Sequence, residues 1–143
     1  MVACIDDIKT RIETVKNKTD NYESKINMYL DAVNIVKKMI DGVTSDIDNL
    51  VEELYEFFNK NMTLEMYLEL KPNMESLCAA ALKLYVRVRK SVLYPGFKTS
   101  VKEFHSSIDG IKEIIHDLDL FLIKLPNNQR FQLLSEKLNK IFE

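Results

Sequence analysis

The sequence predicts an all-α fold, an antiparallel bundle of four main helices with long heptad-patterned first and fourth helices and a short C-terminal fifth helix. Apolar residues recur every three or four positions along most of the chain. Gly and Pro are scarce, at three residues each, so a many-stranded β-fold would lack its turns. The length of 143 residues, 46% of them hydrophobic, fits a single helical-bundle domain over residues 1–143.

The first predicted helix runs from about Ile5 to Asp41. Its apolar positions keep a 3-4-3-4 spacing with one polar member, Thr19, and Gly42 is suited to end the helix in a left-handed conformation. A helix of this length is not stable alone in water, so most of its apolar stripe must be packed. The positions are Ile5, Ile8, Ile12, Val15, Thr19, Tyr22, Ile26, Tyr29, Val33, Val36 and Ile40.

The triplet Thr44–Asp46 offers N-cap residues for a second helix, and the short turn makes this helix an antiparallel neighbour of the first. The stretch Leu64–Leu70 alternates like a strand. A single strand would have no partner, so we favour a short helix that ends before Pro72. Asn73 then caps the third main helix.

The third helix reaches a break at Tyr94–Gly96. The apolar spacing starts the fourth helix at Phe97, whereas the capping-box pattern of Ser100 and Glu103 starts it later. Pro126 marks its end. A short fifth helix follows, and its apolar positions are Phe131, Leu134, Leu138 and Ile141.

Charge is strongly segregated along the chain. The net charge is only −2, but Asp41–Glu75 holds nine acidic and two basic residues, and Ser76–Lys102 holds six basic residues and no acidic one. The basic residues form a candidate site for a partner or an anion such as nucleic-acid phosphate, with Tyr85, Tyr94 and Phe97 available for stacking. Alternatively they face the acidic second helix. The basic residues are Lys83, Arg87, Arg89, Lys90, Lys98 and Lys102.

Cations also flank the apolar stripe of the first helix, and they favour an acidic neighbour. That neighbour is either the acidic helix of the same chain or a second molecule. In the second case the apolar stripe would form a helix–helix interface and would be exposed in the monomer. The cations are Lys9, Arg11, Lys16, Lys18 and Lys25, and the interface residues are Ile5, Ile8, Ile12 and Val15.

No pattern nominates a catalytic centre, a cofactor site or a metal site. Glu113 and His116 have the spacing of a di-iron element, but no second copy exists, and His105 is the other imidazole. Cys78 lies in a small-residue surface typical of helix packing, and Cys4 lies near the terminus. The methionines Met62, Met66 and Met74 are expected to fill the core rather than form an adaptable partner surface.

The sequence therefore predicts a non-enzymatic helical interaction module, an adaptor, small structural subunit or inhibitor that binds another protein or self-associates. The alternative is a nucleic-acid-associated accessory subunit that uses the basic residues at the junction of the third and fourth helices. We expect a cytoplasmic protein with no cofactor, no metal, no membrane contact and no evident small-molecule substrate, since the sequence has no leader pattern and no membrane-spanning apolar run.

Overall fold

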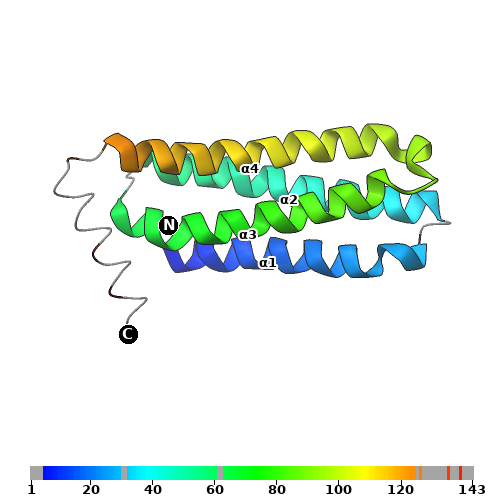
Figure 1. The fold of residues 1–143 in the computed structure, drawn as a ribbon, viewed down its shortest axis with the longest axis horizontal. Coiled ribbons are helices and arrows are strands. Elements are labelled where there is room, and N and C mark those ends of the chain that lie inside the picture. The colour runs from blue at the N-terminus through cyan, green and yellow to red at the C-terminus, as the bar shows by residue number, and fades with distance from the viewer. Residues whose placement is uncertain are drawn as a thin grey trace.

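The computed structural model describes residues 5–29, 32–60 and 63–124, together with Pro126, Ser135 and Asn139. Nearly all of these residues are helical, with four α-helices packed side by side (Figure 1). The all-α prediction and the prediction of four packed helices are confirmed. The predicted fifth helix lies outside the described residues. The elements are α1 (Ile5–Lys25), η1 (Ile26–Tyr29), α2 (Val33–Lys60), α3 (Leu64–Arg89), η2 (Tyr94–Phe97) and α4 (Lys98–Lys124).

The four helices occupy the corners of a square. Helix α1 packs beside α2 and α3, and α4 also packs beside α2 and α3. Consecutive helices run in opposite directions, so α1 and α3 are parallel neighbours, as are α2 and α4 (Figure 1). Helices α2 and α3, although consecutive in the sequence, lie at opposite corners. The predicted antiparallel pairing of the first two helices is present, but α1 packs more extensively against α3.

The single helix predicted from Ile5 to Asp41 is wrong, because α1 ends at Lys25 and α2 begins only at Val33. The apolar spacing continues through this reversal: Ile26 of η1 is fully buried, and both flanking helices bury residues in the same phase. Periodicity alone therefore gave no sign of the turn. Gly42 lies inside α2, and no described glycine has a positive φ.

The predicted cap residues Thr44–Asp46 also lie inside α2. Helix α3 begins after Thr63, whose hydroxyl accepts a hydrogen bond from the backbone N–H of Met66 at 3.3 Å. It continues through Pro72 without ending there, so Asn73 is not a cap. Pro72 is exposed, and buried residues on either side of it hold the two parts of the helix to the same core.

Helix α4 begins directly after Phe97, close to the start that the apolar spacing predicts and earlier than the capping-box pattern indicates. Phe97 is buried at 2% exposure and fixes η2 to the core. Ser100 is buried within the first turn of the helix. The helix ends at Lys124, before Pro126, as predicted.

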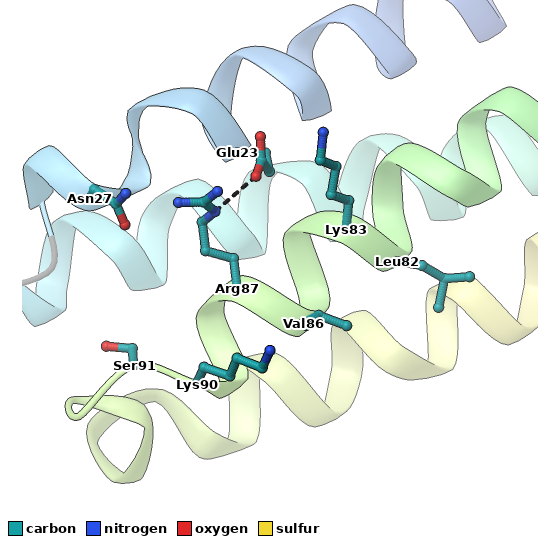
Figure 2. Close-up of a pocket in the computed structure, with 8 residues that line it drawn as sticks. All are labelled: Glu23, Asn27, Leu82, Lys83, Val86, Arg87, Lys90 and Ser91. Carbon is teal, nitrogen blue, oxygen red and sulfur yellow. Dashed lines mark hydrogen bonds and ion pairs between the residues drawn. The ribbon is translucent and has the colours of Figure 1, made fainter.

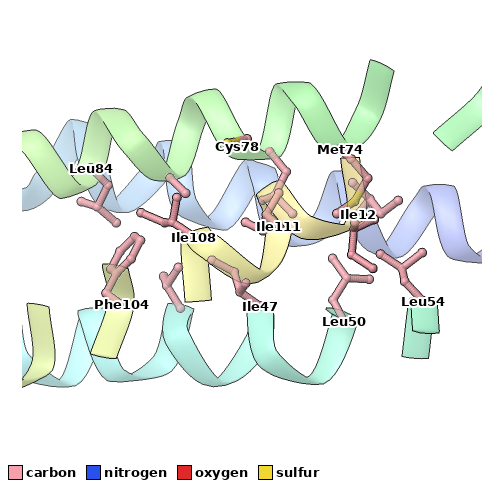
Figure 3. Packing of buried hydrophobic residues seen from close by; sticks show 14 of the residues in the cluster. Ile12, Ile47, Leu50, Leu54, Met74, Cys78, Leu84, Phe104, Ile108 and Ile111 are labelled. Carbon is pink, nitrogen blue, oxygen red and sulfur yellow. The ribbon is translucent and has the colours of Figure 1, made fainter. Parts of the chain in front are cut away.

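All four helices contribute to one hydrophobic core (Figure 3). Phe104, Ile108 and Ile111 of α4 are fully buried and face Leu84 of α3 and Ile47 of α2. Burying each side chain of this kind contributes about 1.5–3 kcal/mol relative to exposure. The core assignment is also confirmed for the methionines at positions 66 and 74, whereas position 62 lies outside the described residues. None of the described helices is long and apolar enough to cross a membrane.

Two glycines should respond to alanine to different extents. A Cβ at Gly110 of α4 would lie 3.7 Å from Val51 Cγ1, an ordinary contact, so Gly110→Ala should stabilise by about 0.5–1 kcal/mol through helix propensity. A Cβ at Gly96 would lie 3.2 Å from Val33 Cγ1, so Val33 must shift slightly to admit it, and Gly96→Ala should be less favourable than Gly110→Ala. Urea unfolding followed by circular dichroism measures both. A loss of stability in Gly110→Ala would contradict the packing described.

Candidate functional site

A groove of about 600 Å³ lies between the C-terminal end of α1 and the last turns of α3 (Figure 2). Glu23 of α1 and Asn27 of η1 form one wall, and α3 and the two residues after it supply the rest of the lining. Because α1 and α3 run in the same direction, both helices end at this end of the bundle. The α3 residues are Leu82, Lys83, Val86 and Arg87, and the residues after its end are Lys90 and Ser91.

Helical spacing sorts the α3 residues into two adjacent stripes. Leu82 and Val86 are four residues apart and form an apolar stripe, in which Val86 is 46% exposed. Lys83, Arg87 and Lys90 follow a 4-3 spacing and form a cationic stripe next to it. The groove therefore offers a partner an apolar strip with positive charge along one side.

Arg87 and Glu23 join α3 to α1 at the middle of the groove. Arg87 Nε donates to Glu23 Oε1 at 2.8 Å (Figure 2). Glu23 is only 8% exposed, so its carboxylate depends on this charge-assisted hydrogen bond for compensation. The Arg87 side chain remains 39% exposed. Its other guanidinium N–H groups are therefore held at the groove surface by the buried carboxylate.

The structure brings only part of the predicted basic patch together. Lys83, Arg87 and Lys90 line the groove. Arg89 points to the other side of α3, where it donates to the hydroxyl of Tyr85 at 2.7 Å and lies over its ring. Lys98 and Lys102 are exposed on α4.

The alternative interpretation, that the basic block faces the acidic second helix, is wrong for the residues of the block on α3. Helices α2 and α3 lie at opposite corners, and the α2 carboxylates contact α1 and α4 instead. Asp46 accepts from Lys18 at 2.6 Å, and Glu53 pairs with Arg11. Asp48 accepts from the Ser107 hydroxyl at 2.6 Å. The prediction assumed that helices consecutive in sequence are neighbours in space.

The cations that flank the apolar stripe of α1 have acidic neighbours within the same chain. Arg11 and Lys18 find their acidic neighbour on α2 of the same chain, and the hydrogen bond to Asp46 raises the pKa of Lys18. Lys9 pairs with Glu69 of α3 at 2.9 Å. Lys16 pairs with Asp20 at 3.1 Å, one turn along α1. A second molecule is not needed to supply these four partners.

The proposed helix–helix interface on α1 is not an exposed surface. Ile8 and Ile12 are 2% and 0% exposed, and Ile5 and Val15 are half-buried against the same core. Ile8 and Ile12 therefore lack the exposure expected of an intermolecular interface, and Ile5 and Val15 are only partly exposed. Helices α2 and α3 of the same chain cover the stripe.

No described residues form a metal-ligand cluster of three or more His, Cys, Asp or Glu side chains. His105 and His116 are both exposed on α4. The His105 ring lies 5.0 Å from the Tyr85 ring, and its Nδ1 lies 3.5 Å from Asp109. Glu113 accepts a hydrogen bond from the hydroxyl of Tyr55 at 3.2 Å.

Sequence reasoning missed the apolar stripe of the groove and its carboxylate. Leu82 and Val86 are out of phase with the buried α3 residues Leu77, Leu84 and Val88, and this mismatch is the signal that could have revealed them. Glu23 had no comparable signal. One acidic residue on a charged helix gives no sign of burial until the neighbouring helix is known.

Cys78 is free and buried on α3, and burial raises the pKa of its thiol. At pH 8 the native protein should therefore contain less thiolate at this position than the unfolded chain. In a Cys4→Ser background, reaction with Ellman's reagent should be at least about tenfold slower in buffer than in denaturing urea. Equal rates would contradict the buried position.

No family model, curated protein or solved structure matches this chain. The groove combines an apolar strip and three cations, one of which is paired with a buried carboxylate, within a few turns of α3 and α1.

Proposed function

We propose that the protein is a non-enzymatic helical interaction module, an adaptor, small structural subunit or inhibitor, that binds another protein through the groove of α1 and α3. The observation that carries the proposal is the exposed apolar strip at Val86 beside Lys83, Arg87 and Lys90. Apolar side chains with arginine are typical of the centres of protein interfaces. The proposal keeps the cytoplasmic location that the sequence predicts.

Further apolar exposure at the same end of the bundle supports a contact surface. Met28 of η1 is 71% exposed, and Val92, just beyond α3, is 91% exposed. Both residues follow the C-terminal ends of parallel neighbouring helices. Burying such side chains in a complex removes apolar surface from water, and this supplies most of the free energy of protein association.

The polar groups of the groove fit binding better than catalysis. Glu23 and Arg87 neutralise each other in an ion pair, and Lys83 and Lys90 are exposed. Within the described residues, Cys78 and the two histidines do not line the groove. Histidine is the commonest general base, and the carboxylate that does line the groove, Glu23, is already bonded to Arg87.

Site-specific crosslinking tests the proposal. The photoreactive residue p-benzoylphenylalanine is placed at Val86 and, as a matched control, at Ile35, which is 45% exposed on α2. The Val86 position should crosslink to a defined protein in native cells, and Val86→Asp in a separate competitor chain should reduce its ability to compete. The measurement is mass spectrometry of the crosslinked product.

The control separates a specific contact from general stickiness, because Ile35 presents a similar apolar side chain on another helix. Equal crosslinking of both positions to the same proteins would contradict the proposed contact surface. A product that contains only the chain itself would identify self-association instead, and sedimentation should then detect a dimer.

The second candidate function is that of a nucleic-acid-associated accessory subunit. One observation favours it: Lys83, Lys90, Lys98 and Lys102 are exposed and have no ion-pair partner among the described residues. Unpaired cations are available to phosphate groups. They are spread over α3 and α4, however, so they would contact a broad backbone rather than a single anion.

Fluorescence anisotropy with labelled single-stranded and duplex oligonucleotides tests this alternative. Four phosphate contacts predict an affinity loss on the order of 100-fold between about 50 and 200 mM salt. Lys98→Glu with Lys102→Glu should weaken binding further, since both lysines are exposed on α4. An absence of binding at low salt would show the alternative to be wrong.

A further inference from the structure

We infer that the groove takes an acidic amphipathic helix of a partner protein, which lies along α3 with its apolar side on Leu82 and Val86 and its carboxylates facing Lys83, Arg87 and Lys90. The inference rests on the proposed function and names the chemistry of the partner. Three properties of the groove lead to it: its charge, the spacing of its side chains, and the way Arg87 is held.

The charge of the groove selects an acidic partner. Lys83, Arg87 and Lys90 line it, and Glu23 is the lining residue of opposite charge. Glu23 is 8% exposed and already bonded to Arg87, so little of its negative charge faces outward. A partner therefore meets positive charge along the whole cationic stripe, and carboxylates placed there gain complementary electrostatics.

The spacing of the side chains selects a helix. The apolar strip follows an i, i+3, i+7 pattern, on which a second helix can pack. Its members are exposed Ala79, half-buried Leu82 and exposed Val86. An extended peptide gains its affinity from the open edge of a sheet. The described residues contain no strand, and most of the groove lining comes from helices.

The Glu23–Arg87 pair prepares the groove for this partner. Nε of Arg87 is bonded at 2.8 Å, and the side chain is therefore ordered before a partner arrives. An ordered cation loses less side-chain entropy on binding than a free lysine does. The exposed N–H groups of the guanidinium can then donate to a second carboxylate in fork geometry.

The size of the groove sets the scale of binding. From Leu82 to the end of α3 at Arg89, the groove follows about 11 Å of helix at 1.5 Å per residue, about two turns. A contact of this length lies at the small end of specific interfaces, which suits a transient partner. Exposed cations at its edge should affect both affinity and the salt dependence of binding.

Designed peptides test the inference by fluorescence anisotropy on the full chain. The probe is a labelled peptide of about 21 residues, three heptads, with Leu at the apolar positions and Glu beside them. One control peptide replaces each Glu by Lys. A second keeps the Glu residues but carries two central prolines, which prevent a continuous helix. Only the acidic helical peptide is expected to bind.

Paired variants locate the binding. The double variant Lys83→Glu with Lys90→Glu should bind the acidic peptide at least about tenfold more weakly than the wild type does. Lys37→Glu with Lys38→Glu makes the same change in charge at two exposed lysines of α2 and should have little effect. Neither pair of lysines has an ion-pair partner among the described residues, and circular dichroism checks that both variants fold.

Each alternative gives a different result. Equal binding of the lysine or proline peptide would overturn the inference. Failure of the acidic peptide while crosslinking at Val86 still captures a protein would overturn the acidic helix and leave the interaction module standing. The surface would be assigned to nucleic acid if an oligonucleotide displaced the peptide and if Lys98→Glu with Lys102→Glu weakened oligonucleotide binding as much as the groove variant does. A dimer lost in Val86→Asp would assign it to a second copy.

Discussion

The mutual burial of four apolar helix faces is the constraint on which the rest of the structure depends. Phe104, Ile108 and Ile111 of α4 are fully buried, and so are Ile12 of α1 and Leu70 of α3. In a square arrangement each helix buries the sides that meet the core and its two neighbours, and one side remains outward. The outward sides of the helices are the surfaces that a partner can contact. Most of them carry charged side chains, but the last turns of α3 also carry apolar side chains.

Which residues form the core could be predicted, because buried positions of a helix recur as apolar residues every three or four positions in the sequence. Ile108, Ile111 and Leu118 of α4 follow the three- and four-residue apolar spacing that predicts the fourth helix, and all are 0% exposed. Helix ends were harder. The stripe of α1 continues in phase past Lys25 into α2, so nothing in the spacing marks the reversal. Pro72 suggested an end where none exists, because a proline at an exposed position removes one backbone hydrogen bond while the core still holds both parts of α3.

The candidate site was predicted only in part, for a reason that lies in the topology. The cations at positions 83, 87 and 90 were singled out by their charge, and they do share a groove. Their surroundings could not be predicted, because the sequence does not state that α3 packs beside α1 and diagonally across from α2. That arrangement gives the acidic residues of α2 to α1 and leaves Glu23 as the partner of Arg87. The number and sign of the charges in each segment can thus be predicted from the sequence. The partner of each charge can be assigned only once the fold is known.

Helix stability accounts for some of the positive charge at the C-terminal end of α3. The positive charge that it does not explain bears on function. Arg87, Arg89 and Lys90 lie at the C-terminal end of α3, where the helix dipole favours cations. Lys83 lies nearly two turns earlier, where the dipole no longer acts, and it is exposed without an ion pair in the described part of the chain. The dipole likewise gives no reason for an exposed Val86 between these cations. A partner that brings both an apolar edge and carboxylates accounts for Lys83 and Val86 together.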